Sequence, residues 1–221
     1  MTVDHLPPTN PILDPARWWR RLCWITDRIA VCGDLPESDI AAQAQLEQWI
    51  AEGVTVIIDV RGEHSDERRV AEWAPQMGYI HLGTHDNGGD QDDRWFILGV
   101  EAVLAALALD PTARVVIHCH MGVNRAPSLA FAVLLALGLE PVEAMTTMRT
   151  ARPIAVAAYA AQALDTHLWA RGVSGPDRTP IVEEFGEWLR ENRVDMGWVI
   201  SRIRRAEWQT DPDVDPDPDA G

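Results

Sequence analysis

The sequence predicts an α/β fold in which a central, mainly parallel sheet is flanked by helices. Short apolar runs rich in β-branched residues, typical of buried strands, alternate along the chain with longer segments of helical composition, and no internal repeat is evident. The 221 residues, 47% of them hydrophobic, are enough for one domain with a substantial core and an appendage.

The individual elements follow from these patterns in order. Strands are expected over the short apolar runs at 25–31, 54–60, 79–82 and 114–118. Helices are expected over 38–51, 66–77, 95–109, 126–137, 141–150 and 155–170. Ser38 suits the N-cap of the first helix, Pro127 suits the first turn of the fourth, and Gly138 suits its end. The polar segment 84–93 cannot build a core and is expected to be a loop.

Composition divides the chain into four parts. Residues 1–22 are an N-terminal lead interrupted by prolines, and residues 23–170 are the main domain. Residues 171–210 are a helical appendage that includes a linker over 172–180. Residues 211–221 alternate Asp and Pro and are expected to be disordered. The tryptophans of the appendage are expected to pack on the main domain rather than to form a ligand site; they are Trp188, Trp198 and Trp208.

Charge and cysteine content exclude several functions. The net charge is −15 and all 19 basic residues are arginine, so lysine-dependent chemistry is absent, and binding to nucleic acid or stable association with an anionic membrane is not expected. The sequence has no apolar run of membrane-spanning length and no signal-like N-terminus, which favours a cytoplasmic location. The three cysteines are too few and too scattered for a disulfide framework, which fits a reducing compartment.

Residues 118–125, His-Cys-His-Met-Gly-Val-Asn-Arg, are the most informative segment. Cys119 and Arg125 enclose five residues, with an apolar strand expected before them and a helix after them. This order is typical of an anion-binding cradle with a nucleophile at its base, because the loop N–H groups, the helix N-terminus and the guanidinium all favour a phosphate and a thiolate. Gly122 lets the backbone turn close to the anion. The alternative is a buried structural cysteine, which would leave Arg125 without a partner in an apolar junction.

The segment His118-Cys119-x5-Arg125 resembles the signature loop of the cysteine-based protein tyrosine phosphatases, and the size of the domain resembles their dual-specificity branch. The resemblance extends over 25–168 and includes 59–61 and 149–153, whereas rhodaneses have a shorter cysteine loop. It implies a protein tyrosine phosphatase-like fold, a catalytic domain over 23–170, Cys119 as nucleophile and Arg125 as phosphate ligand. It also implies that His118 supports the loop from behind, and that the phosphate is cradled by His120, Met121, Gly122, Val123, Asn124 and Arg125.

The same resemblance implies a general acid, an aspartate on a mobile loop upstream of the nucleophile. Asp86 lies 33 positions before Cys119 and is followed by Asn87-Gly88-Gly89, which would let the loop close. The alternatives are Asp90, Asp92 and Asp93, of which the last two better suit a helix N-cap.

No metal ion or cofactor is expected. Four histidines (His81, His85, His118 and His120) invite a metal interpretation, but no credible helix places a His-x3-His pair beside a carboxylate. The sequence departs from the family at Ala126, where Ser or Thr is usual. Hydrolysis of the phosphoenzyme is therefore expected to be slow unless Ser128 or Asn124 compensates.

These observations predict a phosphatase that hydrolyses phosphotyrosine through a cysteinyl-phosphate. A wider form of the prediction adds phosphoserine and phosphothreonine as substrates. Its partners would be phosphorylated proteins or small phosphomonoesters. Two alternatives stay open. A phosphoinositide or other non-protein phosphatase is disfavoured by the few basic residues of the loop, and a catalytically weak phosphate-binding module is favoured mainly by Ala126.

Overall fold

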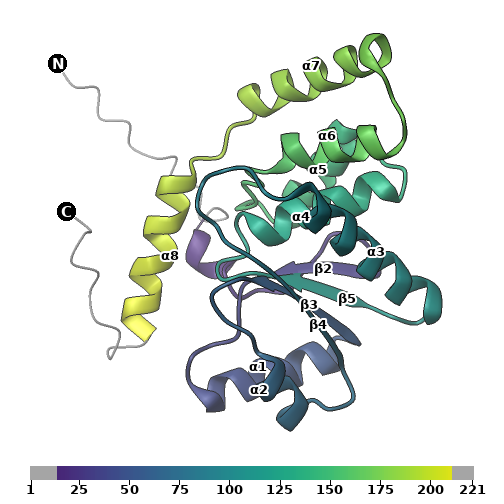
Figure 1. Cartoon of the computed structure of the whole chain (residues 1–221). Coiled ribbons are helices and arrows are strands. Elements are labelled where there is room, and N and C mark those ends of the chain that lie inside the picture. Colours follow the sequence, from purple (N-terminus) through teal and green to yellow (C-terminus); the bar gives the residue numbers. More distant parts are fainter. Residues whose placement is uncertain (1–13, 211–221) are drawn as a thin grey trace, which may run out of the picture.

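The computed structural model describes residues 14–210 and contains a five-stranded sheet between two layers of helices (Figure 1). The strand order is β1-β2-β5-β3-β4, and only β1 is antiparallel to its neighbour. The strands are β1 (Cys23–Trp24), β2 (Ile29–Cys32), β3 (Val56–Arg61), β4 (Gly78–Thr84) and β5 (Val115–His118). The predicted sheet and its mainly parallel character are confirmed. The tail over 211–221 that was expected to be disordered lies outside the described residues.

The register of the central strands places polar residues at one edge. His118, the last residue of β5, pairs with Cys32 of β2 on one side and with Asp59 of β3 on the other. Because these strands are parallel, the segments that follow them leave the sheet at the same edge. The expected strand over 25–31 is shorter than predicted, since residues 25–28 form the connection between the antiparallel β1 and β2.

Helices cover both faces of the sheet. One face packs against α1 (Asp39–Ala51) and α2 (Glu67–Trp73), and the other against α3 (Asp93–Leu109), α4 (Arg125–Ala136), α5 (Pro141–Ala151) and α6 (Ala160–Ala170). Helix α4 is the most deeply buried, because almost every side chain on it is apolar and lies between the sheet and the outer helices. The helix expected over 155–170 is shorter than predicted, since residues 152–159 form a connection with turns and α6 begins only at Ala160.

The appendage consists of α7 (Gly175–Glu191) and α8 (Met196–Thr210). The linker expected over 172–180 is wrong beyond Ser174. Pro176 stands in the first turn, where no N–H is needed, and Pro180 is tolerated inside α7. Helix α7 packs on α5 and α6, and Phe185 stacks on Phe131 of α4 with ring centroids 5.0 Å apart.

Helix α8 lies away from α7, beside the short 3-10 helix Pro15–Arg17 (Figure 1). Trp188 and Trp198 are partly buried against the main body, as expected for packing residues. Within residues 14–210, no helix is both long enough and apolar enough to cross a membrane.

Candidate active site

The loop after β5 is shaped by hydrogen bonds to its outward-facing carbonyl groups. The carbonyl of His120 accepts from the indole of Trp19 and from the N–H of Asp34, and the carbonyl of Val123 accepts from the N–H groups of Val156 and Ala157. Within the described part of the chain, no protein acceptor takes the N–H groups of residues 120–124. The loop is therefore a nest of unsatisfied donors at the N-terminus of α4, which is an anion-binding arrangement.

Gly122 is required by both the conformation and the space around it. Its φ of +61° lies in the left-handed region. A Cβ atom at this position would lie 2.3 Å from Nη2 of Arg152 and 2.5 Å from the carbonyl oxygen of Cys32. A side chain is therefore excluded on both counts.

Arg152, which follows α5, supports the loop from the side away from the expected phosphate. Its side chain is fully buried. The guanidinium donates to the carbonyl of Gly122 (Nε to O, 2.6 Å) and to that of Met121 (3.1 Å). It also donates to three carbonyls of the N-terminal segment, those of Trp18, Trp19 and Arg21. One cation thus ties the loop to the N-terminal segment, which lies more than 130 positions before Arg152 in the sequence.

Arg125 begins α4 and points across the loop toward Glu63, in the segment after β3. Nη1 and Nη2 each donate to a carboxylate oxygen of Glu63 at 2.6 Å, and Nη1 also donates to the carbonyl of Thr84. Burial alone would raise the pKa of Glu63, but the hydrogen bonds from Arg125 lower it to about 2. Nε of Arg125 is buried and has no hydrogen-bond partner among the described residues.

Cys119 lies at the base of the loop, 2% exposed, in a cavity of about 220 Å³. The loop residues predicted to bind phosphate line this cavity, apart from Gly122. Asp86 lines the same cavity, so the structure brings the predicted nucleophile, phosphate ligand and acid together.

The carboxylate of Asp86 is held in a fixed orientation. Its Oδ1 accepts from Nδ2 of Asn124 (2.7 Å) and from the hydroxyl of Tyr159 (2.6 Å). Burial, followed by the bond to Asp86, raises the pKa of Tyr159 to about 12, so the phenol stays a donor. The other oxygen, Oδ2, lies 3.7 Å from Nε of Arg125 and takes no part in these two bonds.

The competing aspartates are placed differently. Asp92 caps α3, with its side chain accepting from the N–H of Arg94. Asp93 accepts from the side chains of Thr166 and Gln162 on α6, and Asp90 is exposed and lines no cavity with Cys119. The geometry therefore favours Asp86 among the four.

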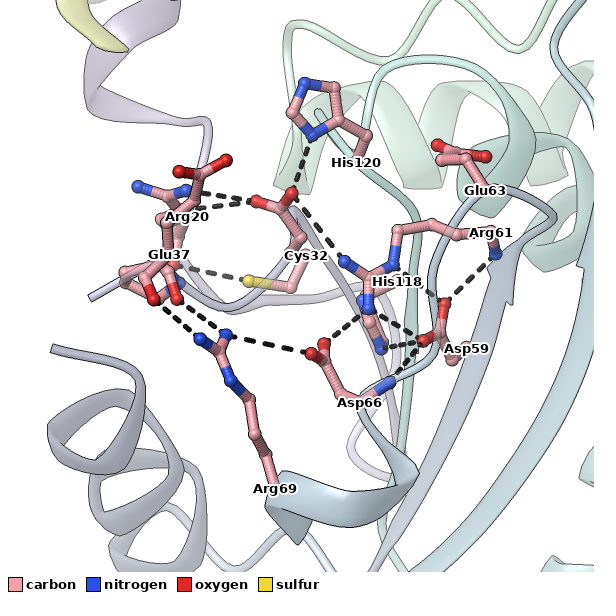
Figure 2. Close-up of polar contacts among 12 residues, drawn as sticks. Arg20, Cys32, Glu37, Asp59, Arg61, Glu63, Asp66, Arg69, His118 and His120 are labelled. Atoms are coloured by element: carbon pink, nitrogen blue, oxygen red, sulfur yellow. Dashed lines mark hydrogen bonds and ion pairs between the residues drawn. The ribbon is translucent and has the colours of Figure 1, made fainter. Parts of the chain in front are cut away.

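Behind the loop lies a buried network of charges (Figure 2). Arg61 binds Asp59 through two hydrogen bonds and also binds Asp66, while the ring of His118 lies 3.7 Å from Asp59. The carboxylates of Asp59 and Asp66 and the ring of His118 are within 4.8 Å of one another, a spacing that could suit a metal ion. Arg61 already binds both carboxylates and supplies the positive charge there. The cluster does not include the other three histidines considered as ligands.

His118 is fully buried, and neither ring nitrogen has a hydrogen-bond partner among the described residues. Its ring contacts Trp49 of α1, with centroids 5.8 Å apart. His120 is different, because its Nδ1 lies 2.6 Å from Oδ2 of Asp34. Burial opposes the charged form, but the hydrogen bond to Asp34 and the nearby carboxylate of Glu207 outweigh it and raise the pKa of His120. The loop therefore carries a second cation at slightly acidic pH.

The groups considered as substitutes for a hydroxyl at Ala126 are already engaged. Ala126 is fully buried. The hydroxyl of Ser128 accepts from the N–H of Tyr159, and the side chain of Asn124 joins Asp86 to the N–H of Ala158. These bonds fix the orientation of both side chains, but the hydroxyl of Ser128 and the second N–H of Asn124 each keep a hydrogen to donate.

Several site residues were missed by the sequence analysis. They are Asp34, Glu63, Arg152, Tyr159 and three residues of α8, namely Met196, Ile200 and Arg204. All reach the loop through the fold rather than through proximity in sequence. The 149–153 segment had been included in the resemblance, but no local signal identified which of its residues holds the loop.

The sequence matches no protein-family model, and no curated protein is similar enough to be counted as a relative. Solved structures do match. Human DUSP28 shares 18% identity with a TM-score of 0.55, covering 70% of this chain and all of its own. A mouse putative dual specificity phosphatase, solved as a complex with zinc tungstate, shares 18% identity with a TM-score of 0.56, covering 78% of this chain and 96% of its own.

A human tyrosine phosphatase-like serine/threonine/tyrosine-interacting protein gives a TM-score of 0.54 at 16% identity, covering 70% of this chain and 99% of its own. At these identities the comparison establishes the fold. The chain therefore has the fold of the cysteine-based protein tyrosine phosphatases, in the form found in their dual-specificity branch.

Proposed function

We propose that the protein is a cysteine-dependent phosphomonoesterase with Cys119 as nucleophile, acting on phosphotyrosine and related monoesters. The observation that carries the proposal is one cavity that combines the sulfur of Cys119, the unsatisfied N–H groups of the loop, Arg125 and the carboxylate of Asp86. A phosphate monoester needs these groups together, because it is a dianion with a poor leaving group. A cytoplasmic location and soluble phosphorylated substrates belong to the same proposal.

In the first step, the thiolate of Cys119 attacks phosphorus and forms the S–P bond while the P–O bond to the leaving group breaks. Asp86 gives a proton to the departing oxygen, so that the alcohol or phenol leaves neutral. The proton would be carried by Oδ2, because Tyr159 and Asn124 both donate to Oδ1. These two bonds orient the acid without occupying its reactive oxygen.

In the second step, water attacks phosphorus and the S–P bond breaks, releasing inorganic phosphate and the thiolate of Cys119. Asp86, now a carboxylate, takes a proton from the water. With alanine at position 126, the departing sulfur lacks the hydroxyl that Ser or Thr would place there, and this step is the slow one in the proposal.

Arg125 would bind the phosphate through the edge formed by Nε and Nη2. Nε has no hydrogen-bond partner among the described residues. Glu63 takes one N–H from each of Nη1 and Nη2, which leaves the second N–H of Nη2 for the phosphate. Substrate can therefore approach while Glu63 keeps Arg125 in place. A bidentate contact of this kind strengthens as charge spreads over the equatorial oxygens in the transition state.

The test is the hydrolysis of a small aryl phosphate by the wild type and by Cys119→Ser and Asp86→Asn. We expect Cys119→Ser to be inactive and Asp86→Asn to lose about 10²- to 10⁴-fold in turnover, more for poor leaving groups than for good ones. Cys23→Ser, at a second buried cysteine that does not line the cavity, is the matched control and should stay active. A wild type that binds phosphotyrosine peptide without hydrolysing any ester would instead favour the binding-module alternative.

A further inference from the structure

Helix α8 forms one wall of the cavity that contains Cys119. The other lining residues come from the phosphate-binding loop and from Asp86, whereas α8 contributes Met196, Ile200 and Arg204. These three are spaced four apart, so they form a single stripe along one face of the helix. A helix that follows the main domain therefore contributes directly to the space where a substrate would lie.

The adjacent stripe of α8 fixes the helix to the loop. Val199 and Ile203, which are 1% and 0% exposed, pack in one apolar cluster with Trp19, Val123 and Ile154. Val123 belongs to the phosphate-binding loop, and Trp19 donates to the carbonyl of His120 within that loop. The position of α8 is thus coupled to the catalytic loop by direct contact.

Polar contacts near both ends of α8 hold the same position. Before its first turn, the guanidinium of Arg149 on α5 donates to the carbonyl of Asn192, while the side chain of Asp195 caps α8 itself by accepting from the N–H of Trp198. Toward its end, Oε1 of Glu207 lies 4.0 Å from Nε2 of His120. Burial is the main cause of a raised pKa at Glu207, consistent with its position against the main body.

We propose that α8 makes the catalytic pocket selective for aryl phosphates over alkyl phosphates, with Met196 and Ile200 as the apolar wall for the aromatic ring. The inference rests on the proposed phosphatase activity and extends it to the choice of substrate. An aromatic ring would pack against the aliphatic carbons of Ile200 and the thioether of Met196. The guanidinium of Arg204 would add a cation–π contact. The single methylene of phosphoserine offers none of these contacts.

The experiment compares kcat/KM for a phosphotyrosine peptide and a phosphoserine peptide with identical flanking residues, using the full chain. In Ile200→Ala we expect the ratio of the two values to fall about 5- to 20-fold, because several methyl and methylene contacts to the ring are lost. Met196→Ala should change the ratio in the same direction. This side chain is 39% exposed, so its removal does not endanger the core.

Two exposed residues provide matched controls. Arg205→Ala changes an arginine of α8 that does not line the cavity, and Ile40→Ala removes an isoleucine on α1 that is 85% exposed. Both should keep the wild-type ratio. The inference is overturned if Ile200→Ala and Met196→Ala are folded and also keep the wild-type ratio.

A binding measurement separates this inference from the proposed function. The affinities of both peptides are measured for Cys119→Ser alone and for Cys119→Ser combined with Ile200→Ala. If the wild type hydrolyses neither peptide, the proposed activity is wrong, yet the affinity ratio still tests α8. A preference for phosphotyrosine that disappears with Ile200→Ala supports the inference, and equal ratios in the two proteins contradict it.

Discussion

Replacing Arg152 by methionine should release the phosphate-binding loop from its support while keeping an unbranched apolar stem in the buried position. In the structure the guanidinium donates to five backbone carbonyls, two in the loop and three in the segment around Trp19. Methionine leaves all five without this donor in a fully buried position. The loop carbonyls, including that of Gly122, would then be free to turn inward, where the phosphate must bind.

The magnitude follows from the cost of buried unsatisfied acceptors. Each carbonyl left without a donor costs about 1–3 kcal/mol, and the costs are not additive because the segment relaxes and admits water. The carbonyls of Trp18, Trp19 and Arg21 keep a second donor. Only those of Met121 and Gly122 then lack a donor among the described residues, so we take about 2–6 kcal/mol. For a domain of this size about 1 kcal/mol shifts Tm by roughly 2–4 °C, so Arg152→Met should lower Tm by roughly 4–24 °C.

Thermal unfolding and inhibition by tungstate or vanadate, read on the same samples below Tm, test the two consequences together. The oxyanion should bind at least about 10-fold more weakly, since several N–H groups no longer converge. Arg94→Met, at an exposed arginine in the first turn of α3, is the control and should match the wild type. An Arg152→Met protein with unchanged Tm and unchanged oxyanion affinity would refute the reasoning.

Three further predictions concern the loop itself. Gly122→Ala should abolish oxyanion binding in a folded protein, as checked by vanadate inhibition and circular dichroism, because a Cβ there would overlap the carbonyl of Cys32. Ala126→Ser should raise steady-state turnover and shrink any burst in stopped-flow assays; no change would mean that sulfur departure is not limiting. The raised pKa of His120 implies a stabilising contribution that is complete below its ordinary value of about 6.5 and is lost as pH rises through the raised value. The free energy of unfolding should therefore differ between wild type and His120→Gln more at pH 6 than at pH 9, and a pH-independent difference would contradict this assignment.

Much of the fold could be predicted because its signals are local. The apolar β-branched runs identify β3 and β5 directly, and the polar 84–93 segment identifies the loop that carries Asp86. The linker expected over 172–180 is wrong beyond Ser174, because Pro176 lies in a helical first turn and Pro180 is accommodated inside α7. A proline in the first turns of a helix therefore does not mark a helix boundary.

The candidate site could likewise be predicted only where its signal is local. Cys119 and Arg125 stand in one short segment, so their spacing was visible in the sequence. Glu63 and Tyr159 enter through contacts across 62 and 73 positions, which depend on strand order and helix packing rather than on any local pattern. Ile200 of α8 is the extreme case, because nothing in its own segment indicates which surface the helix will cover.

The most direct test of the central claim is to trap the covalent intermediate. Wild-type protein is mixed with an aryl phosphate, quenched in acid within the first turnover, digested and analysed by mass spectrometry. The account predicts one added phosphoryl group on the peptide that contains Cys119, and none in Cys119→Ser. Hydrolysis of the ester with no phosphoryl group on Cys119, or with the group on another residue, would contradict it.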